Sequence, residues 1–166
     1  MAKQVIKNDR PWALVSGGSK GIGYAIATAL AKRNYNLILI ARNVEALNNA
    51  KSKLETAFST QVEILALDMS KEDSATTIES WCNENDLPLK MVCNVSGIGG
   101  SADYLSGPLT DSLYMLRLNT EPAVSLIYYL LPLLKKNQPS FILNVSSLAG
   151  FAPISIKNIY SATNLL

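Results

Sequence analysis

Histidine is absent from this chain of 166 residues, and cysteine occurs only twice, at Cys82 and Cys93. Without an imidazole, acid–base chemistry near neutral pH must come from Tyr, Lys, Asp or Glu side chains tuned by their surroundings. The two cysteines lack the spacing of a metal site and do not form a secreted disulfide framework. We therefore expect reduced thiols, no metal ion and a cytoplasmic protein.

The chain also has a small net charge and no long apolar run. The net charge is +2 and no basic run is present, which argues against a nucleic-acid partner. The first ten residues are polar, and no stretch approaches a membrane-spanning length, so we expect no membrane partner. A hydrophobic content of 48% with 17% charged residues instead predicts one globular domain over residues 1–166.

The most informative stretch is a glycine-rich turn between a strand and a helix. Residues 13–15 form a short apolar run typical of a buried strand, and glycines follow at Gly17, Gly21 and Gly23. Glycine allows close approach of a ligand to the backbone, and the start of a helix directs unpaired N–H groups and partial positive charge at the turn. These features suit a phosphate group. A ligand-free tight turn is the alternative, and we favour nucleotide binding.

Short apolar strands alternate with helical segments along the rest of the chain. Further strands are predicted at residues 37–41, 62–67, 91–95 and 141–145. Apolar stripes expected to face the core comprise Ile22, Ile26, Ala29 and Leu30 in one helix and Val44, Leu47, Leu54 and Phe58 in the next. Apolar strands separated by helices indicate a parallel sheet covered on both sides. We predict a doubly wound α/β domain.

Local signals predict where the helices begin and bend. Asn43 is a suitable N-cap, and Ser70 with Asp73 resembles a capping box that opens another helix. A long helix is predicted over residues 111–136, with a bend or break caused by Pro122 or Pro132. The last predicted helix begins at Lys157 and runs to the end of the chain.

Ligands of doubly wound sheets bind beyond the carboxyl ends of the strands, where this chain has five polar segments. They are Ser-Gly-Gly-Ser-Lys-Gly-Ile-Gly at 16–23, Asp68, Asn-Val-Ser-Gly at 94–97, Asn119 in Arg-Leu-Asn-Thr, and Asn-Val-Ser-Ser at 144–147 followed by Tyr160. In the order and spacing of these segments the chain resembles the classical short-chain dehydrogenase/reductase family. The resemblance implies a three-layer Rossmann-like fold with strand order 3-2-1-4-5. It also implies hydride transfer between a nicotinamide cofactor and a carbonyl or secondary alcohol, with residues 142–151 similar to 3-oxoacyl reductase-like members.

The residue after the second predicted strand bears on the choice of cofactor. An NAD site usually places Asp or Glu there, whereas Arg42 can pair with a 2′-phosphate. Lys20 adds a second cation; both could instead be solvated surface charges, and we favour NADP(H). By resemblance, Asp68 would hold the adenine amino group. The full predicted cofactor-binding set is Gly17, Ser19, Lys20, Gly21, Ile22, Gly23, Arg42, Asp68, Asn94, Ser96 and Gly97.

The resemblance assigns the catalytic roles. Tyr160 would be the general acid/base, Ser147 would hold the carbonyl oxygen, and Asn119 would organise a bound water. Family members carry a lysine four residues after the tyrosine, where this chain has Asn164. Such an ammonium group is worth roughly 4 kcal/mol to a tyrosinate at about 4 Å and an effective dielectric of about 20. We expect severe loss of activity unless another cation, of which Lys157 is a candidate, takes its place.

The sequence stops two residues after Asn164, whereas family members usually continue through this helix, two further strands and a substrate-covering segment. We therefore expect an unpaired edge on the fifth strand and bare apolar surface, covered by another subunit or by the rest of a longer parent chain. The alternative function is a catalytically impaired or inactive dinucleotide-binding fragment or sensor. By resemblance the 111–136 helix is the contact of a homo-oligomer, although the same pattern also suits a core helix.

Overall fold

The computed structural model describes residues 10–99, 107–152 and 157–164. The polar N-terminal residues and the last two residues of the predicted final helix lie outside this range. The strands are β1 (Trp12–Ser16), β2 (Asn36–Ala41), β3 (Val62–Ala66), β4 (Leu89–Asn94) and β5 (Phe141–Asn144). The helices are α1 (Gly21–Ala31), α2 (Val44–Ala57), α3 (Ser74–Glu84), α4 (Leu109–Lys136) and α5 (Asn158–Thr163), with a 3₁₀ turn η1 (Leu148–Gly150).

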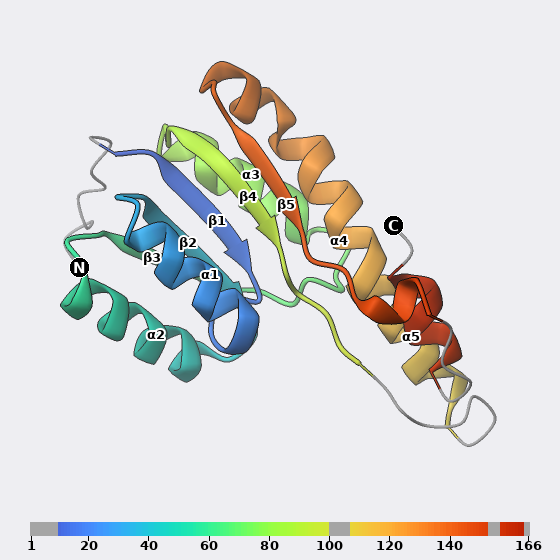
Figure 1. Cartoon of the computed structure of the whole chain (residues 1–166). Coiled ribbons are helices and arrows are strands. Elements are labelled where there is room, and N and C mark those ends of the chain that lie inside the picture. The colour runs from blue at the N-terminus through green and yellow to red at the C-terminus, as the bar shows by residue number, and fades with distance from the viewer. Residues whose placement is uncertain (1–9, 100–106, 153–156, 165–166) are drawn as a thin grey trace.

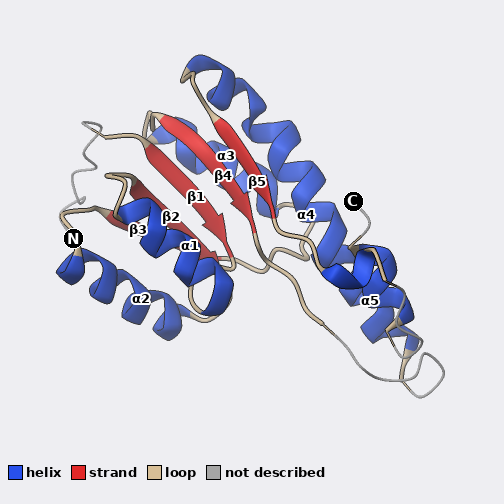
Figure 2. Ribbon diagram, in the orientation of Figure 1, coloured by secondary structure: helices blue, strands red, loops and turns tan. Residues whose placement is uncertain are grey.

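The described strands form one parallel sheet in the order β3-β2-β1-β4-β5, which confirms the predicted doubly wound fold and its strand order (Figure 1). In Figure 2 the helices lie on both faces of the sheet, with α1 and α2 on the near face and α3 and α4 behind it. This is the three-layer arrangement expected when each parallel strand is connected to the next through a helix.

The central strand β1 divides its side chains between two hydrophobic cores. Trp12 and Leu14 pack into the core shared with α3 and α4, whereas Ala13 and Val15 face the core shared with α1 and α2. All four side chains are fully buried, because successive residues of a strand point to opposite faces and both faces are covered here. This central strand therefore gives a rigid base to the loops at its carboxyl end.

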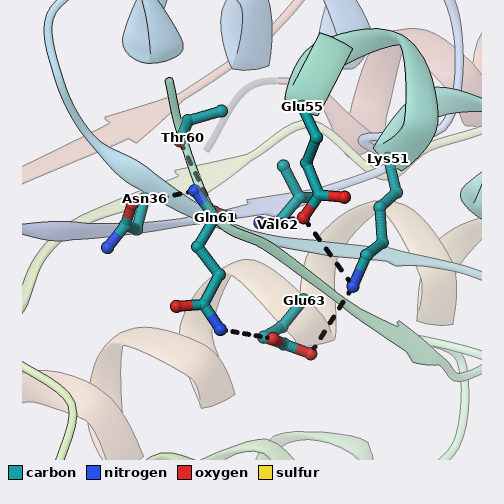
Figure 3. A network of polar contacts seen from close by, with 7 residues as sticks. All are labelled: Asn36, Lys51, Glu55, Thr60, Gln61, Val62 and Glu63. Carbon is teal, nitrogen blue, oxygen red and sulfur yellow. Dashed lines mark hydrogen bonds and ion pairs between the residues drawn. The ribbon is translucent and has the colours of Figure 1, made fainter. Parts of the chain in front are cut away.

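The two edge strands differ in how they meet solvent. At the β3 edge, the Val62 N–H donates to Glu55 Oε1 at 3.0 Å, and Lys51 Nζ lies 3.9 Å from carboxylate oxygens of both Glu55 and Glu63 (Figure 3). At the opposite edge, all residues of β5 are exposed and the Phe141 side chain is 55% exposed. Among the described residues β5 is thus an edge strand that pairs with β4 alone and exposes apolar side chains, as predicted.

One predicted helix start is confirmed and another is wrong. Asn43 is the N-cap of α2, and its Oδ1 accepts from the Ala46 N–H at 2.7 Å. The expected capping box is wrong because α3 begins only after Asp73, which makes no side-chain cap. Ser70 is too far upstream to cap the helix, and it donates to the Asp68 carboxylate instead.

Two further expectations about the helices are wrong, namely a break in the long helix and a core position for Ile22. The helix α4 continues through Pro122 and Pro132 without a break, because buried residues such as Leu126 hold one face against the core and tertiary packing compensates for the missing N–H groups. The alternative of a bend at these prolines stays a prediction. Ile22 was expected to face the core, but its side chain is 64% exposed. It lies in the first turn of α1, beyond the end of the sheet, whereas Leu30 further along the helix is buried as predicted.

Candidate active site

A cleft of about 480 Å³ lies at the carboxyl ends of the parallel strands. The predicted site residues that line it are Gly17, Ser19, Lys20, Gly21, Ile22, Gly23, Arg42, Ser96, Gly97, Asn119, Tyr160 and Asn164. Asp68, Asn94 and Ser147 are described but do not belong to this lining. The structure thus brings the predicted phosphate turn and the predicted catalytic tyrosine to one cleft, although they are far apart in the sequence.

The glycine turn has a backbone that other residues would not adopt. Gly17 and Gly21 have φ values of +71° and +57°, in the left-handed region that favours glycine. A Cβ atom at Gly23 would lie 2.2 Å from the Gly17 carbonyl oxygen. In the described structure α1 has no side-chain cap at Lys20, so the first N–H groups of the helix are left for a ligand. These features are those expected of a cradle for a phosphate group.

Arg42 immediately follows β2 and lies at the cleft. Its Nη1 donates to the Tyr114 hydroxyl oxygen at 2.6 Å, and its guanidinium carbon lies 6.0 Å from the centre of the Tyr114 ring. Tyr114 belongs to α4 and packs against the core on that side of the sheet. The sequence gives no sign that Tyr114 belongs to the site, because a tyrosine in an apolar helix is equally typical of a core residue.

Asp68 follows β3 and is fixed by a neighbouring serine. Its Oδ1 accepts from the Ser70 N–H at 3.0 Å and from the Ser70 hydroxyl at 2.8 Å. Partial burial acts to raise the pKa of the Asp68 carboxyl, but the Ser70 hydrogen bonds and the positive charges of Arg42 and Lys71 outweigh it and lower the pKa below its usual value. Asp68 is therefore an ionised acceptor at neutral pH.

Serine and asparagine side chains join the carboxyl ends of three strands. Ser16 Oγ, at the end of β1, accepts from the Val95 and Ser96 N–H groups at 3.0 and 3.1 Å. Asn94 Nδ2, at the end of β4, donates to Asn144 Oδ1 of β5 at 2.7 Å. Ser16 lay within the family-like segment but outside the predicted site set. These contacts hold the loop after β4 against the glycine turn.

Asn119 connects α4 to two other parts of the site. Its Oδ1 accepts from the Ile98 N–H at 2.9 Å, and its Nδ2 donates to the Ile98 carbonyl at 2.9 Å and to Thr163 Oγ1 at 3.0 Å. Thr163 in turn donates to the Tyr160 carbonyl at 2.8 Å. The amide therefore holds both the loop after β4 and the helix that carries Tyr160, and Thr163 is a contact that sequence reasoning missed.

Tyr160 lines the cleft beside a lysine that precedes it in the chain. Lys157 Nζ lies 5.8 Å from the centre of the Tyr160 ring. Asn164, at the position of the family lysine, donates its side-chain N–H to the Tyr160 carbonyl at 2.7 Å. The amide is thus directed onto its own helix, and it is Lys157 that places a positive charge over the tyrosine ring.

The two serines after β5 have different contacts. Ser147 is the N-cap of η1, where its Oγ accepts from the Ala149 N–H at 3.2 Å. Ser146 lines the cleft and donates its hydroxyl to the Asn164 carbonyl at 2.6 Å. Ser146 therefore links the end of β5 to α5, a role that the sequence pattern did not separate from that of Ser147.

A parallel sheet with a glycine-rich cradle at the end of its first strand defines an α/β protein built to bind a nucleotide. The family model described as short chain dehydrogenase matches residues 11–164, and the chain belongs to this family. The family prediction made from the five sequence segments is confirmed.

Relatives of known identity have the same architecture. The chain is 30% identical over 158 residues to the very-long-chain 3-oxoacyl-CoA reductase of Mus musculus, with 92% of this chain and 49% of that protein covered. A short-chain dehydrogenase from Sphingobium yanoikuyae in complex with NADPH matches with a TM-score of 0.85 and 26% identity over 93% of this chain and 61% of its own. An alcohol dehydrogenase from the archaeon Thermococcus sibiricus complexed with 5-hydroxy-NADP matches with a TM-score of 0.87 and 26% identity, covering 93% of this chain and 66% of its own.

The chain spans about half the length of the curated relatives it matches. No helix among residues 10–99, 107–152 and 157–164 is both long and apolar enough to cross a membrane. The same stretches contain no cluster of three or more His, Cys, Asp or Glu side chains suited to a metal ion.

Proposed function

We propose that this chain binds NADP(H) and is the cofactor-binding part of an oxidoreductase that acts on a carbonyl or secondary alcohol. The observation that carries the proposal is the glycine cradle and uncapped start of α1 in the same cleft as Tyr160. The related dehydrogenases complexed with NADPH and 5-hydroxy-NADP support the choice of cofactor.

The proposed cofactor contacts follow the strand ends. Gly17, Gly21 and Gly23 bring the backbone close to the pyrophosphate, and the N–H groups of α1 offset its negative charge. Arg42 recognises the 2′-phosphate, because a guanidinium can form two parallel hydrogen bonds to phosphate oxygens, and Lys20 adds charge nearby. Asp68 accepts from the adenine amino group. Asn94, Ser96 and Gly97 support the sheet and border the cofactor.

The proposed chemistry uses Tyr160 as the proton donor. When bound, the cofactor supplies or accepts the hydride. Tyr160 gives its hydroxyl proton to the carbonyl oxygen in the reducing direction, and Ser147 holds that oxygen with a hydrogen bond. Lys157 supplies the cation that stabilises the resulting tyrosinate, since its ammonium group lies 5.8 Å from the ring centre. Asn119 keeps α5 in register with the cleft through Thr163.

A cofactor-binding protein with impaired or no catalysis is the second candidate. It is favoured by Asn164, which carries no charge and whose amide is hydrogen-bonded to the Tyr160 carbonyl. The two candidates are separated by Asn164→Lys in a chain extended to family length. If that variant binds NADPH but reduces none of a broad panel of hydrophobic carbonyl compounds, including 3-oxoacyl thioesters, the enzyme assignment is wrong and the second candidate stands.

The direct test of the proposed cofactor is a titration of the chain with NADPH and NADH, followed by nicotinamide fluorescence and by the melting temperature. We expect saturable binding with NADPH preferred. Absence of binding by either nucleotide would contradict the proposal for this chain. The homo-oligomer through α4 stays a prediction: Leu126 and Leu130 bury one face of the helix, while Val124 and Tyr128 leave exposed apolar surface for a contact.

A further inference from the structure

Arg42, which lines the cleft, is in contact with Tyr114 although the two residues are 72 positions apart in the sequence. Arg42 leaves the end of β2 and is exposed, whereas Tyr114 is half-buried and packs against the α3–α4 core. The Arg42 guanidinium donates to the Tyr114 hydroxyl at 2.6 Å and lies over its ring. A mobile surface cation is thus held by an aromatic side chain that is itself fixed by packing.

Restricting the arginine costs entropy before any ligand arrives, so the contact prepares the side chain for binding. A free arginine must lose much rotamer freedom when it engages a phosphate, and a pre-positioned one loses less. The guanidinium has five N–H donors, and the bond to Tyr114 uses one of them. The remaining donors suffice for two parallel hydrogen bonds to a phosphate group.

The identity of the partner also matters. A phenol hydroxyl is neutral at ordinary pH, so it holds Arg42 without cancelling the positive charge that attracts an anion. A carboxylate partner would hold the guanidinium as well, but it would repel a phosphate. The nearby carboxylate of Asp68 is engaged by Ser70, and the side-chain hydrogen bond of Arg42 is made to Tyr114.

We propose that Tyr114 is a positioning residue for recognition of the 2′-phosphate and that it acts by holding the Arg42 guanidinium at the adenosine end of the cleft. This rests on the proposed function, in which Arg42 reads that phosphate. Tyr114 itself need not contact the cofactor. Its effect is confined to ligands that carry the 2′-phosphate.

The test compares Tyr114→Phe with the wild-type chain by calorimetric titration with adenosine 2′,5′-bisphosphate and with adenosine 5′-monophosphate. The substitution removes only the hydroxyl and keeps the packed ring. We expect the bisphosphate to bind about three- to tenfold more weakly and the monophosphate to bind as before, because one charge-assisted hydrogen bond is lost. Tyr128→Phe is the matched control, since Tyr128 lies on the same helix with its side chain 74% exposed, and it should change neither affinity.

A double-mutant cycle establishes whether Tyr114 acts through Arg42. In an Arg42→Gln background, Tyr114→Phe should have no further effect on the bisphosphate, because the group that it positions is gone. Equal weakening of both ligands, full additivity in the cycle, or unchanged or tighter bisphosphate binding in Tyr114→Phe would each overturn the proposal. Wild-type chain that binds no bisphosphate would overturn it as well.

If the cofactor assignment is wrong, the titrations give a result different from the one that overturns the role of Tyr114. The bisphosphate lacks the nicotinamide half, so it probes only the adenosine end of the cleft. Wild-type chain that binds the bisphosphate in the expected way but binds neither NADPH nor NADH would refute the cofactor assignment while leaving the role of Tyr114 supported.

Discussion

The β2–β3 side of the sheet and the β4–β5 side have similar strand sequences but different surroundings. Residues 37–40 of β2 read Leu-Ile-Leu-Ile and are fully buried, whereas residues 141–143 of β5 read Phe-Ile-Leu and are exposed. At the edge strand β3, Lys51 Nζ lies 3.9 Å from a Glu63 carboxylate oxygen, and a charged pair of this kind discourages pairing with a further strand (Figure 3). The β5 strand itself contains no charged residue.

Within the described residues, the two sides of the sheet therefore differ in how far helices cover them. On the β2–β3 side, α1 and α2 cover the sheet and the glycine cradle is built in full. On the β4–β5 side, Phe141 and Leu143 are exposed, and they pair in register with Met91 and Cys93, which face the α1–α2 core. In Figure 1 no labelled helix covers β5 on that face. We therefore expect cofactor recognition to be a property of the first side, and catalysis to depend on what covers the second.

The largest effect is expected from emptying the core of the complete side. Leu39→Ala removes a fully buried side chain of β2 and should lower the free energy of unfolding by about 2–5 kcal/mol. Leu143→Ala makes the same change in β5, where the side chain is 36% exposed, and should cost about 1 kcal/mol or less. Urea unfolding followed by circular dichroism measures both. Equal losses for the two variants would remove the distinction between the sides.

The next largest effect is expected at the phosphate turn. In Gly23→Ala the new methyl group would collide with the Gly17 carbonyl, because a Cβ there lies 2.2 Å from that oxygen. The turn must open, and NADPH affinity should fall at least about tenfold, a loss of about 1.4 kcal/mol or more. A control is available at Gly107→Ala, where the added Cβ meets nothing within 4 Å and the residue does not line the cleft. Tight NADPH binding by Gly23→Ala would mean that the cradle is not used.

An effect of similar size, but restricted to one of the two nucleotides, is expected at the end of β2. Arg42→Ala should weaken NADPH binding by about 10- to 100-fold, because charge-assisted hydrogen bonds to the 2′-phosphate are lost, and should leave NADH binding nearly unchanged. Fluorescence titration with both nucleotides measures the ratio. Lys32→Ala, which removes a cation at the far end of α1, serves as the control. An equal loss for both nucleotides would contradict a role in reading the 2′-phosphate.

The last effect concerns the pH dependence of stability and arises from the two buried thiols. Burial raises the pKa of the Cys82 thiol to about 12 and that of the Cys93 thiol to about 11. Because the folded state holds these protons more tightly than the unfolded state, their contribution to stability is complete below pH 9 and is lost as the pH rises through about 11 for Cys93 and about 12 for Cys82. Urea midpoints measured from pH 8 to 10.5 should therefore fall, and replacement of both cysteines by alanine should reduce that slope.

The same thiols also test whether β5 opens before the rest of the sheet. Cys93 is paired in register with Leu143 of β5, whereas Cys82 lies in α3. We expect a thiol-specific reagent to label Cys93 before Cys82 in the native protein, because β5 opens first. Mass spectrometry of the labelled peptides gives the order. The reverse order would contradict early opening of β5.

The sequence predicted those features that depend on neighbours along the chain. The strand before Gly17, the cap at Asn43 and the strand order follow from local patterns and from the family-like segments. The misplaced cap at Ser70, three residues before the observed N-cap, and the exposed Ile22 show that a few residues of uncertainty at a helix start change a side chain's role.

The contacts that sequence reasoning missed are made across the fold. Tyr114 reaches Arg42 from another layer, and Thr163 connects Asn119 to the helix of Tyr160. Hydroxyl-bearing residues in apolar helices give no signal of such partners, because the same residues are common in cores and on surfaces. Lys157 was recognised as a candidate cation, but its position over the Tyr160 ring required the structure.

The central claim, that one side of this fold is complete for NADP(H) recognition while the other is open, is tested most directly by hydrogen exchange of backbone amides with and without NADPH. We predict strong protection in β1 and β2, weak protection in β5, and additional protection by NADPH at residues 17–24. Equal protection of β5 and β1, or protection by NADPH that bypasses the glycine turn, would contradict the account.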